Sequence, residues 1–260
     1  MPPLRGLPMR PPLLTRSWRA GPPDFVGVGV QRAGTSWWYS MLEHHPEVQP
    51  RPRKELHFFD RFWGEELTDE KLAIYHGEFL RPAGKVCGEW TPRYLFDVWT
   101  PPLLRRAAPD AKLLIMLRDP VERFRSGVTH AVERGWKVDE TLVSDAVQRG
   151  FYHRQLTRLL EHFPRDQVLV LQYEQCRADT AALFGLTLQF LGLGPGPAPA
   201  ARSRPVNHST IEVNLLPSVL QELRHVYEDD VRRLETDFPT LDLQLWPHFA
   251  RSAGPVQPSA

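Results

Sequence analysis

Asp24-Phe-Val-Gly-Val-Gly-Val-Gln-Arg-Ala-Gly-Thr-Ser-Trp37 is the stretch that decides the fold of this 260-residue chain. Its first half is a short apolar run rich in β-branched valine, which is typical of a buried strand. Two glycines then frame a loop, and beyond it Trp38, Met41 and Leu42 fall on one side of a helical pattern. The stretch predicts a strand, a tight loop and a helix in direct succession.

The loop in this stretch, Gly29-Val-Gln-Arg-Ala-Gly-Thr-Ser36, fits the G-x-x-x-x-G frame of a phosphate-binding loop between a strand and a helix. Backbone N–H groups at a helix start point outward, where the helix dipole also favours an anion. A phosphate group is therefore expected at the N–H groups of Gly34, Thr35, Ser36 and Trp37. The alternative is a glycine turn that only connects the two elements.

The charge in this loop differs from that of a nucleotide triphosphatase. Thr35 occupies the position of the lysine that reaches the β and γ phosphates in those enzymes. The cation of this loop is Arg32, which is placed to meet a single 5′-phosphate and the oxygen that links it to a transferring group. An ATPase or GTPase is therefore disfavoured.

Further apolar runs alternate with helical patterns along the chain. Strands are predicted at Lys85–Glu89, Lys112–Leu117 and Gln167–Leu171. Helices are predicted at Val98–Ala107, Val121–Glu133, Leu142–His162, Thr180–Leu191 and Leu215–Asp237. Because parallel strands need crossover connections that cover the sheet, the alternation predicts an α/β fold of three layers, P-loop-like, with a central parallel sheet flanked by helices.

Composition indicates one globular unit. The chain is 42% hydrophobic and 24% charged, which is enough apolar material for one sizeable core, and its formal net charge of +1 argues against a nucleic-acid partner. Cys87 and Cys176 stand far apart without CxxC or Cys/His spacing, so neither a disulfide framework nor a metal site is expected.

The two ends of the chain are expected to lie outside the domain. Residues 1–23 are rich in proline and arginine, and residues 251–260 form a short tail, so both are predicted to be disordered. No apolar run is long enough for a signal peptide or a membrane span, which predicts a cytoplasmic protein without integral membrane contact. The domain itself is expected at residues 24–250.

A second motif, Leu117-Arg-Asp-Pro-Val-Glu-Arg-Phe-Arg-Ser126, directly follows a predicted strand. Pro120 suits the first position of a helix, Arg118 can form a forked contact with a phosphate, and Ser126 can donate a hydroxyl two turns later. A solvated basic helix start would explain Arg123 and Arg125 but not the whole string. Arg123 is also placed for an internal ion pair with the neighbouring acids of the motif.

Together the two motifs resemble those of the sulfotransferases that use 3′-phosphoadenosine 5′-phosphosulfate (PAPS). The resemblance implies a 5′-phosphosulfate loop with Arg32 at the family's lysine position, followed by Ala33, Gly34, Thr35, Ser36 and Trp37. It implies a 3′-phosphate site at Arg118 and Ser126, and Trp37 stacked on adenine while Trp38 packs in the core. A late basic loop with Arg202 and Arg204 would cover the nucleotide. PAPS would be the co-substrate and adenosine 3′,5′-bisphosphate the product, with no metal.

The acceptor side is indicated by Lys54-Glu-Leu-His-Phe-Phe-Asp60, which resembles a segment of heparan-sulfate-type and related bacterial sulfotransferases. Glu55 matches the family's general base, and an attacking hydroxyl needs one. His57 is an alternative base, or orients Glu55. Trp90 replaces a lysine of the heparan-sulfate enzymes, which favours an aromatic or apolar hydroxyl compound, or a plain sugar packed on Trp90, over a polyanionic chain.

The resemblance predicts a PAPS-dependent sulfotransferase that acts on a hydroxyl or amine of a small-molecule or carbohydrate acceptor. Two other functions stay open: a P-loop kinase of small metabolites, and a nucleotide-binding module that has lost catalysis. The acceptor and the oligomeric state are not indicated by the sequence.

Overall fold

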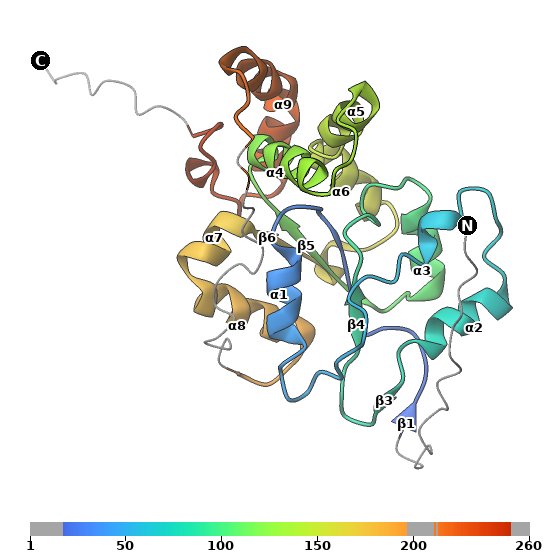
Figure 1. The fold of residues 1–260 in the computed structure, drawn as a ribbon. Coiled ribbons are helices and arrows are strands. Elements are labelled where there is room, and N and C mark those ends of the chain that lie inside the picture. Colours follow the sequence, from blue (N-terminus) through green and yellow to red (C-terminus); the bar gives the residue numbers. More distant parts are fainter. Residues whose placement is uncertain (1–17, 197–210, 212, 251–260) are drawn as a thin grey trace, which may run out of the picture.

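The computed structural model describes residues 18–196, 211 and 213–250, and Figure 1 shows the arrangement of its elements. At the centre, parallel strands lie in the order β4-β2-β5-β6. They are β2 (Phe25–Gly29), β4 (Gly88–Trp90), β5 (Lys112–Leu117) and β6 (Val168–Gln172). Most of their residues are buried, as expected of strands that face helices on both sides. The predicted α/β fold with a central parallel sheet is confirmed.

The helices lie around this sheet. Their bounds are α1 (Thr35–Leu42), α2 (Asp69–Gly77), α3 (Thr100–Ala107), α4 (Pro120–Glu133), α5 (Glu140–Gln148), α6 (Tyr152–Leu160), α7 (Tyr173–Ala178), α8 (Thr180–Leu191) and α9 (Pro217–Asp237). Short 3-10 turns occur at Phe59–Arg61, Arg165–Gln167 and Leu243–Leu245. Figure 1 shows α1, α7 and α8 on one side of the sheet, α2 and α3 on the other, and α4, α5 and α9 grouped where β5 leads into α4.

The predicted helix over Leu142–His162 is wrong in one respect, because the structure divides it into α5 and α6. The Tyr227 hydroxyl, from α9, donates a hydrogen bond to the Val147 carbonyl at 2.9 Å. That carbonyl also accepts from the Gly150 N–H at 2.9 Å, which is the tighter i→i+3 bond with which helices often end. The break lets α6 turn and pack along α9, which is a long-range contact that the local sequence pattern does not contain.

Two short helices, α2 and α7, were not predicted from the sequence. Helix α2 begins after Thr68, whose hydroxyl accepts a hydrogen bond from the Lys71 N–H, and Asp69 and Glu70 occupy its first turn. Threonine at the cap followed by acidic residues is a recognised start signal, so this helix was readable from the sequence. Helix α7 directly continues β6 and is only six residues long, too short for a periodic pattern.

The folded unit starts earlier than predicted. β1 (Trp18–Arg19) pairs antiparallel with β3 (Arg81–Pro82), and Arg81 also binds Asp24 through its guanidinium at 2.7 Å. The expected disordered arm is therefore wrong for residues 18–23. Residues 1–17 and the predicted tail at 251–260 lie outside the described residues.

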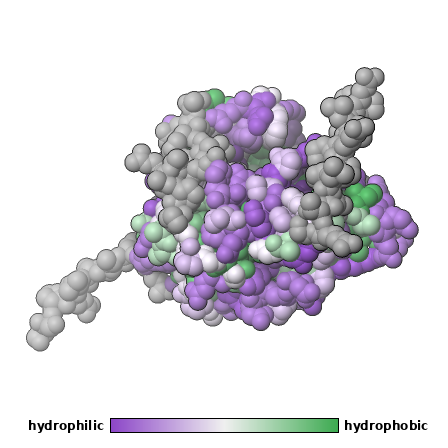
Figure 2. Space-filling view, turned by 90° about the horizontal axis from the view of Figure 1, so that it is seen from below, coloured by the Kyte–Doolittle hydropathy of each residue, from purple (hydrophilic) through white to green (hydrophobic). Residues whose placement is uncertain are grey.

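The surface seen in Figure 2 is mostly hydrophilic, with small apolar spots rather than one broad apolar face. Scattered apolar residues of this kind are ordinary on a water-exposed surface. In the part of the chain that the structure describes, no helix combines the length and apolar character needed to cross a lipid bilayer.

Candidate active site

The phosphate loop joins β2 to α1 in a conformation that requires glycine at its end. Gly34 has a φ of +87° and immediately precedes the first residue of α1. A Cβ at this position would lie 2.7 Å from the Tyr173 ring, so both the backbone and the packing exclude a side chain. The predicted succession of strand, loop and helix is confirmed, and the helix start faces the cavity described below.

The structure brings together the two predicted nucleotide motifs, which are far apart in sequence. The Arg32 Nε donates a hydrogen bond to the Ser126 hydroxyl at 3.1 Å, and an Arg118 N–H donates to the Arg32 carbonyl at 3.3 Å. Arg118 also lies 3.6 Å from the Glu122 carboxylate and over the Tyr173 ring. Two guanidinium groups and a hydroxyl thus share one site, as contact with a doubly phosphorylated nucleotide requires.

Arg118 is held in place through its own backbone and through the next residue of the chain. Its backbone carbonyl accepts a hydrogen bond from the Tyr152 hydroxyl at 2.9 Å, and Tyr152 is fully buried. Asp119 caps α4 by accepting from the N–H groups of Val121 and Glu122. This cap fixes the helix on which Ser126 lies, because a carboxylate at the first position satisfies N–H groups that the helix itself leaves free.

The prediction that Arg123 forms an ion pair with a neighbouring acid of its motif is wrong. Arg123 is almost fully buried and donates a hydrogen bond to the Ala146 carbonyl of α5. The acid Glu122 pairs instead with Arg125 at 2.9 Å, since the two side chains lie one turn apart on the exposed side of α4. Arg123 therefore fastens α5 to α4, and it also reaches the wall of the cavity.

The acceptor segment forms a chain of charges around Glu55. One oxygen of the Glu55 carboxylate lies 2.7 Å from the Lys54 ammonium, and the other lies 3.1 Å from His57 Nε2. His57 Nδ1 lies 2.8 Å from the Asp60 carboxylate. Glu55 and His57, the two predicted candidates for the base, are thus in direct contact, and His57 is placed to orient Glu55.

These contacts separate the protonation states of the two candidates. Hydrogen bonds to Asp60 and then to Glu55 raise the pKa of His57 to about 10, so its ring is protonated at neutral pH. Burial would raise the pKa of Glu55, but the hydrogen bond from His57 and the charge of Lys54 outweigh it and lower that pKa to about 2. Glu55 is therefore the ionised group, and His57 the cation that holds it.

The backbone of the acceptor segment is fixed by the strand beside it. The Leu56 N–H donates to the Glu89 carboxylate at 3.1 Å, and the Phe58 N–H donates to the Tyr94 hydroxyl at 2.9 Å. Glu89 is fully buried at β4 and also accepts from the Tyr75 hydroxyl at 2.9 Å. A buried carboxylate that accepts several hydrogen bonds is a rigid anchor, and it sets the position of Glu55.

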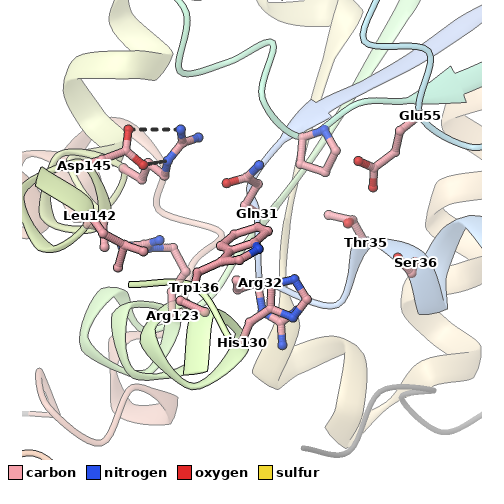
Figure 3. Close-up of a pocket in the computed structure, with 15 residues that line it drawn as sticks. Gln31, Arg32, Thr35, Ser36, Glu55, Arg123, His130, Trp136, Leu142 and Asp145 are labelled. Carbon is pink, nitrogen blue, oxygen red and sulfur yellow. Dashed lines mark hydrogen bonds and ion pairs between the residues drawn. The ribbon is translucent and has the colours of Figure 1, made fainter. Parts of the chain in front are cut away.

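A cavity of about 260 Å³ opens between these elements (Figure 3). The phosphate loop and α1 form one wall, and the ends of α4 and α5 form the other. Its lining includes Gln31, Arg32, Thr35, Ser36, Glu55, Pro92, Arg123, His130, Trp136, Leu142, Asp145 and Arg149. Figure 3 shows Glu55 and Trp136 on different sides of this space. Arg32 of the phosphate loop and the Glu55 carboxylate, which is the predicted base, therefore line one cavity.

Two tryptophans with predicted roles at the site are buried. Trp37 is 1% exposed and makes edge contacts with Trp38 and Tyr173, and its stacking on adenine stays a prediction. The predicted packing of an acceptor on Trp90 is wrong. Trp90 is 0% exposed, and its indole N–H donates to the Gly29 carbonyl at 3.1 Å. Trp90 packs in the sheet against Gly27, because its side chain points along the sheet face rather than into the cavity.

Comparison with known proteins agrees with this geometry. The sequence matches the model of the sulfotransferase family over residues 65–194, which is half of the chain. The chain belongs to the sulfotransferase family. Human heparan sulfate glucosamine 3-O-sulfotransferase 3B1 is 31% identical over 186 residues, which cover 66% of this chain and 46% of the human protein. Mouse heparan sulfate glucosamine 3-O-sulfotransferase 6 is also 31% identical over 186 residues, with 66% of this chain and 52% of the mouse protein covered.

The chain therefore spans about half the length of the curated relatives that it matches. Among solved structures, a sulfotransferase from Alicyclobacillus acidocaldarius is 27% identical with a TM-score of 0.68, and the match covers 86% of this chain and 98% of that one. The sulfotransferase domain of the curacin biosynthetic pathway, at 13% identity and a TM-score of 0.54, shares the fold.

The candidate site contains residues that were not predicted from the sequence. The sequence pattern predicts no role for Lys54, yet its ammonium reaches the hydroxyls of Thr35 and Ser36 at the start of α1. Trp136 carries the exposed aromatic ring of the cavity, which was expected from Trp90, and it is 57% exposed. An isolated tryptophan between two predicted helices gave no local signal for this position.

Other predicted members of the site stay predictions. Ala33 is buried, while Thr35 and Ser36 line the cavity. Arg202 and Arg204 lie outside the described residues. Within the described part of the chain, no three His, Cys, Asp or Glu side chains are grouped so that they could hold a metal ion.

Proposed function

We propose that this sulfotransferase moves a sulfuryl group from PAPS to a hydroxyl of a carbohydrate or small-molecule acceptor. The observation that carries the proposal is the contact of Arg32 with Ser126 at the edge of a cavity that also holds Glu55. That contact joins the 5′-phosphosulfate motif to the 3′-phosphate motif, and only a donor with both groups would use the two together. A kinase of small metabolites has no need for the second motif.

In the proposed reaction the chain supplies binding, orientation and a base. Arg32 and the N–H groups at the start of α1 bind the 5′-phosphosulfate, and Arg118 and Ser126 bind the 3′-phosphate. The acceptor oxygen attacks sulfur and forms the new O–S bond, while the bond from sulfur to the 5′-phosphate oxygen breaks. The acceptor proton passes to Glu55, and adenosine 3′,5′-bisphosphate leaves with the electron pair. Arg32 stabilises the charge that develops on the leaving phosphate.

The protonation states support Glu55 over His57 as the base. A protonated imidazole has no lone pair to accept a proton, and the contacts of His57 with Asp60 and Glu55 keep it protonated at neutral pH. The Glu55 carboxylate is ionised and lines the cavity. His57 then orients the carboxylate and balances its charge.

The cavity favours an acceptor with a polar edge and a flat apolar face. Trp136 offers an open ring that packs edge-on against His130, and Pro92 and Leu142 add apolar surface. Its charges are largely balanced, since Arg149 is paired with Asp145 at 2.6 Å. Sugars and aromatic alcohols both fit this lining because they combine hydroxyls with a stacking face. The human and mouse relatives named above are heparan sulfate glucosamine 3-O-sulfotransferases, but the balanced charges here favour a neutral acceptor.

Calorimetric titration tests the donor. The sulfotransferase should bind adenosine 3′,5′-bisphosphate without metal and should bind ATP with magnesium far more weakly. The opposite preference would support the kinase. The acceptor is then sought by incubation with ³⁵S-labelled PAPS and a fractionated cell extract, followed by mass spectrometry of the labelled product. Bisphosphate binding without any labelled product would indicate a binding module that has lost catalysis.

A further inference from the structure

Lys54 has contacts that the proposed reaction does not yet use. Its ammonium lies 3.1 Å from the Thr35 hydroxyl, 3.2 Å from the Ser36 hydroxyl and 2.7 Å from the Glu55 carboxylate. Only 16% of its side chain is exposed. An ammonium group has three protons to donate, and here all three have an acceptor. Lys54 thus connects the proposed base to the start of the helix that faces the donor.

The Lys54 ammonium lies beside the residue whose place is taken by a lysine in nucleotide triphosphatases. Thr35 stands where nucleotide triphosphatases have the lysine that reaches the transferring phosphate. Lys54 comes from a different segment, whose backbone is tied to the sheet because the Lys54 carbonyl accepts from the Trp90 N–H at 2.9 Å. The four-carbon side chain spans from this fixed backbone to the first turn of α1. Lys54 therefore adds a second cation beside Arg32, and it does so from outside the loop.

Two of the three acceptors that Lys54 contacts would compete only weakly with a phosphate for its ammonium group. Neutral hydroxyl acceptors bind an ammonium less strongly than an anionic oxygen does. A phosphosulfate at the start of α1 would carry negative oxygens into the place where the Thr35 and Ser36 hydroxyls now hold the ammonium. The flexible stem of lysine allows the charged group to turn toward them without movement of the backbone.

We propose that Lys54 is a cation shared between base and donor: it pairs with Glu55 until the donor arrives and then turns to the phosphosulfate, which releases the carboxylate. This inference rests on the proposed function. Its consequence is an order of events, because Glu55 becomes a stronger base only when there is a sulfuryl group to transfer.

The electrostatics of the site agree with this exchange. Burial lowers the pKa of Lys54, and its contact with Glu55 acts in the opposite direction, so the pair depends on mutual contact. Removal of Lys54 from Glu55 moves the pKa of the carboxyl upward, toward its ordinary value, because one of the two cations that lower it is gone. Besides Lys54 and His57, the charged or titratable groups that share the cavity with Glu55 are Arg32, Arg123, His130, Asp145 and Arg149.

A thermodynamic cycle with adenosine 3′,5′-bisphosphate as the probe tests the sharing. We expect K54M to weaken bisphosphate binding by about 10-fold or more, the loss of one charge-assisted hydrogen bond. E55Q should tighten binding when Lys54 is present, since the competing carboxylate is gone, and should do so by less in the K54M background. K54R keeps the charge and should stay within about threefold of wild type. K71M is the matched control, because Lys71 pairs with Glu65 on the surface away from the cavity.

A second measurement reports the base directly. With ¹³C-carboxyl glutamate, and E55Q to assign the resonance, saturation with the bisphosphate should raise the pKa of Glu55 more in wild type than in K54M. K54Q repeats both measurements with an uncharged polar side chain, so a folding defect in K54M does not leave the question open.

The outcomes separate this inference from the proposed function. If wild type binds the bisphosphate but E55Q changes its affinity equally with and without Lys54, the sharing is refuted while the donor site stands. An equal rise of the Glu55 pKa in wild type and K54M refutes it as well. If wild type does not bind the bisphosphate at all, the proposed function falls and takes this inference with it.

Discussion

Gly27→Ala tests whether Trp90 belongs to the core or to the acceptor site. Gly27 lies in the central strand β2, paired with Trp90 on β4. A Cβ built on Gly27 would lie 2.0 Å from two atoms of the Trp90 ring. That ring is fully buried and its N–H is bonded to the Gly29 carbonyl, so it has no space to retreat into. The clash can therefore be relieved only if either the Trp90 ring or strand β2 moves.

The free energy of unfolding that Gly27→Ala should lose can be estimated from these contacts. Overpacking of a filled core costs about 1–3 kcal/mol, and displacing the ring leaves the Gly29 carbonyl unpaired at a further ~1–3 kcal/mol. A total of about 4 kcal/mol is a large part of the ~5–15 kcal/mol stability of a typical domain. With a urea m-value of about 3 kcal/mol/M, the unfolding midpoint should fall by about 1.3 M.

Urea unfolding followed by circular dichroism measures this shift, with two comparisons. Gly185→Ala lies inside α8, and no atom is within 4 Å of its added Cβ. This variant should raise the free energy of unfolding by about 0.5–1 kcal/mol. Trp90→Leu alone should be destabilising because it leaves a cavity, but the double variant Gly27→Ala/Trp90→Leu should lose less than the sum of the two. A wild-type midpoint for Gly27→Ala, or strict additivity in the double variant, would refute the packing argument.

Three further predictions concern the site. Glu55→Gln should reduce sulfuryl transfer by about 10²–10⁴-fold, the usual share of a general base, while bisphosphate binding is no weaker than in wild type; an active variant would move the base role to His57. Asp60→Asn should lower the pKa of His57 from about 10, seen by ¹⁵N NMR of the ring, because its first hydrogen-bond partner loses its charge. Since that pKa is raised on folding, the contact stabilises the fold fully below the ordinary histidine pKa and loses its effect as the pH rises through about 10, so an unchanged titration in Asp60→Asn would contradict the geometry. Trp136→Ala should lower kcat/KM for the acceptor found with labelled PAPS by about 3–10-fold, whereas Trp63→Ala, a 75% exposed tryptophan outside the cavity lining, should leave it unchanged.

Much of the donor site was predictable because its determinants are local. A phosphate loop needs a strand, a glycine with positive φ and a helix start, and all three lie within Phe25 to Trp38. The second motif likewise combines a strand end, a capping Asp119 and Pro120 at the helix start. Short-range hydrogen bonds and backbone preferences decide such features, so the sequence pattern carries them.

The acceptor side could not be predicted in the same way. Trp37, Trp90 and Trp136 are equally aromatic in the sequence, but only the packing of distant elements leaves one of them open to the cavity. At the break between α5 and α6, the Val147 carbonyl accepts a hydrogen bond from Tyr227, which lies about 80 residues further along the chain. Burial is a property of the assembled core, and no local window contains it.

The sequence by itself determined that this protein has a strand-loop-helix phosphate site, a second phosphate motif and a carboxylate segment, because each is encoded by neighbouring residues. Only the tertiary structure decided that Arg32 meets Ser126, that Lys54 reaches both Glu55 and the start of α1, and that Trp136 rather than Trp90 lines the cavity. The physical reason is the parallel sheet, which brings loops from distant strands to one edge, where contacts form between residues that the chain itself keeps far apart.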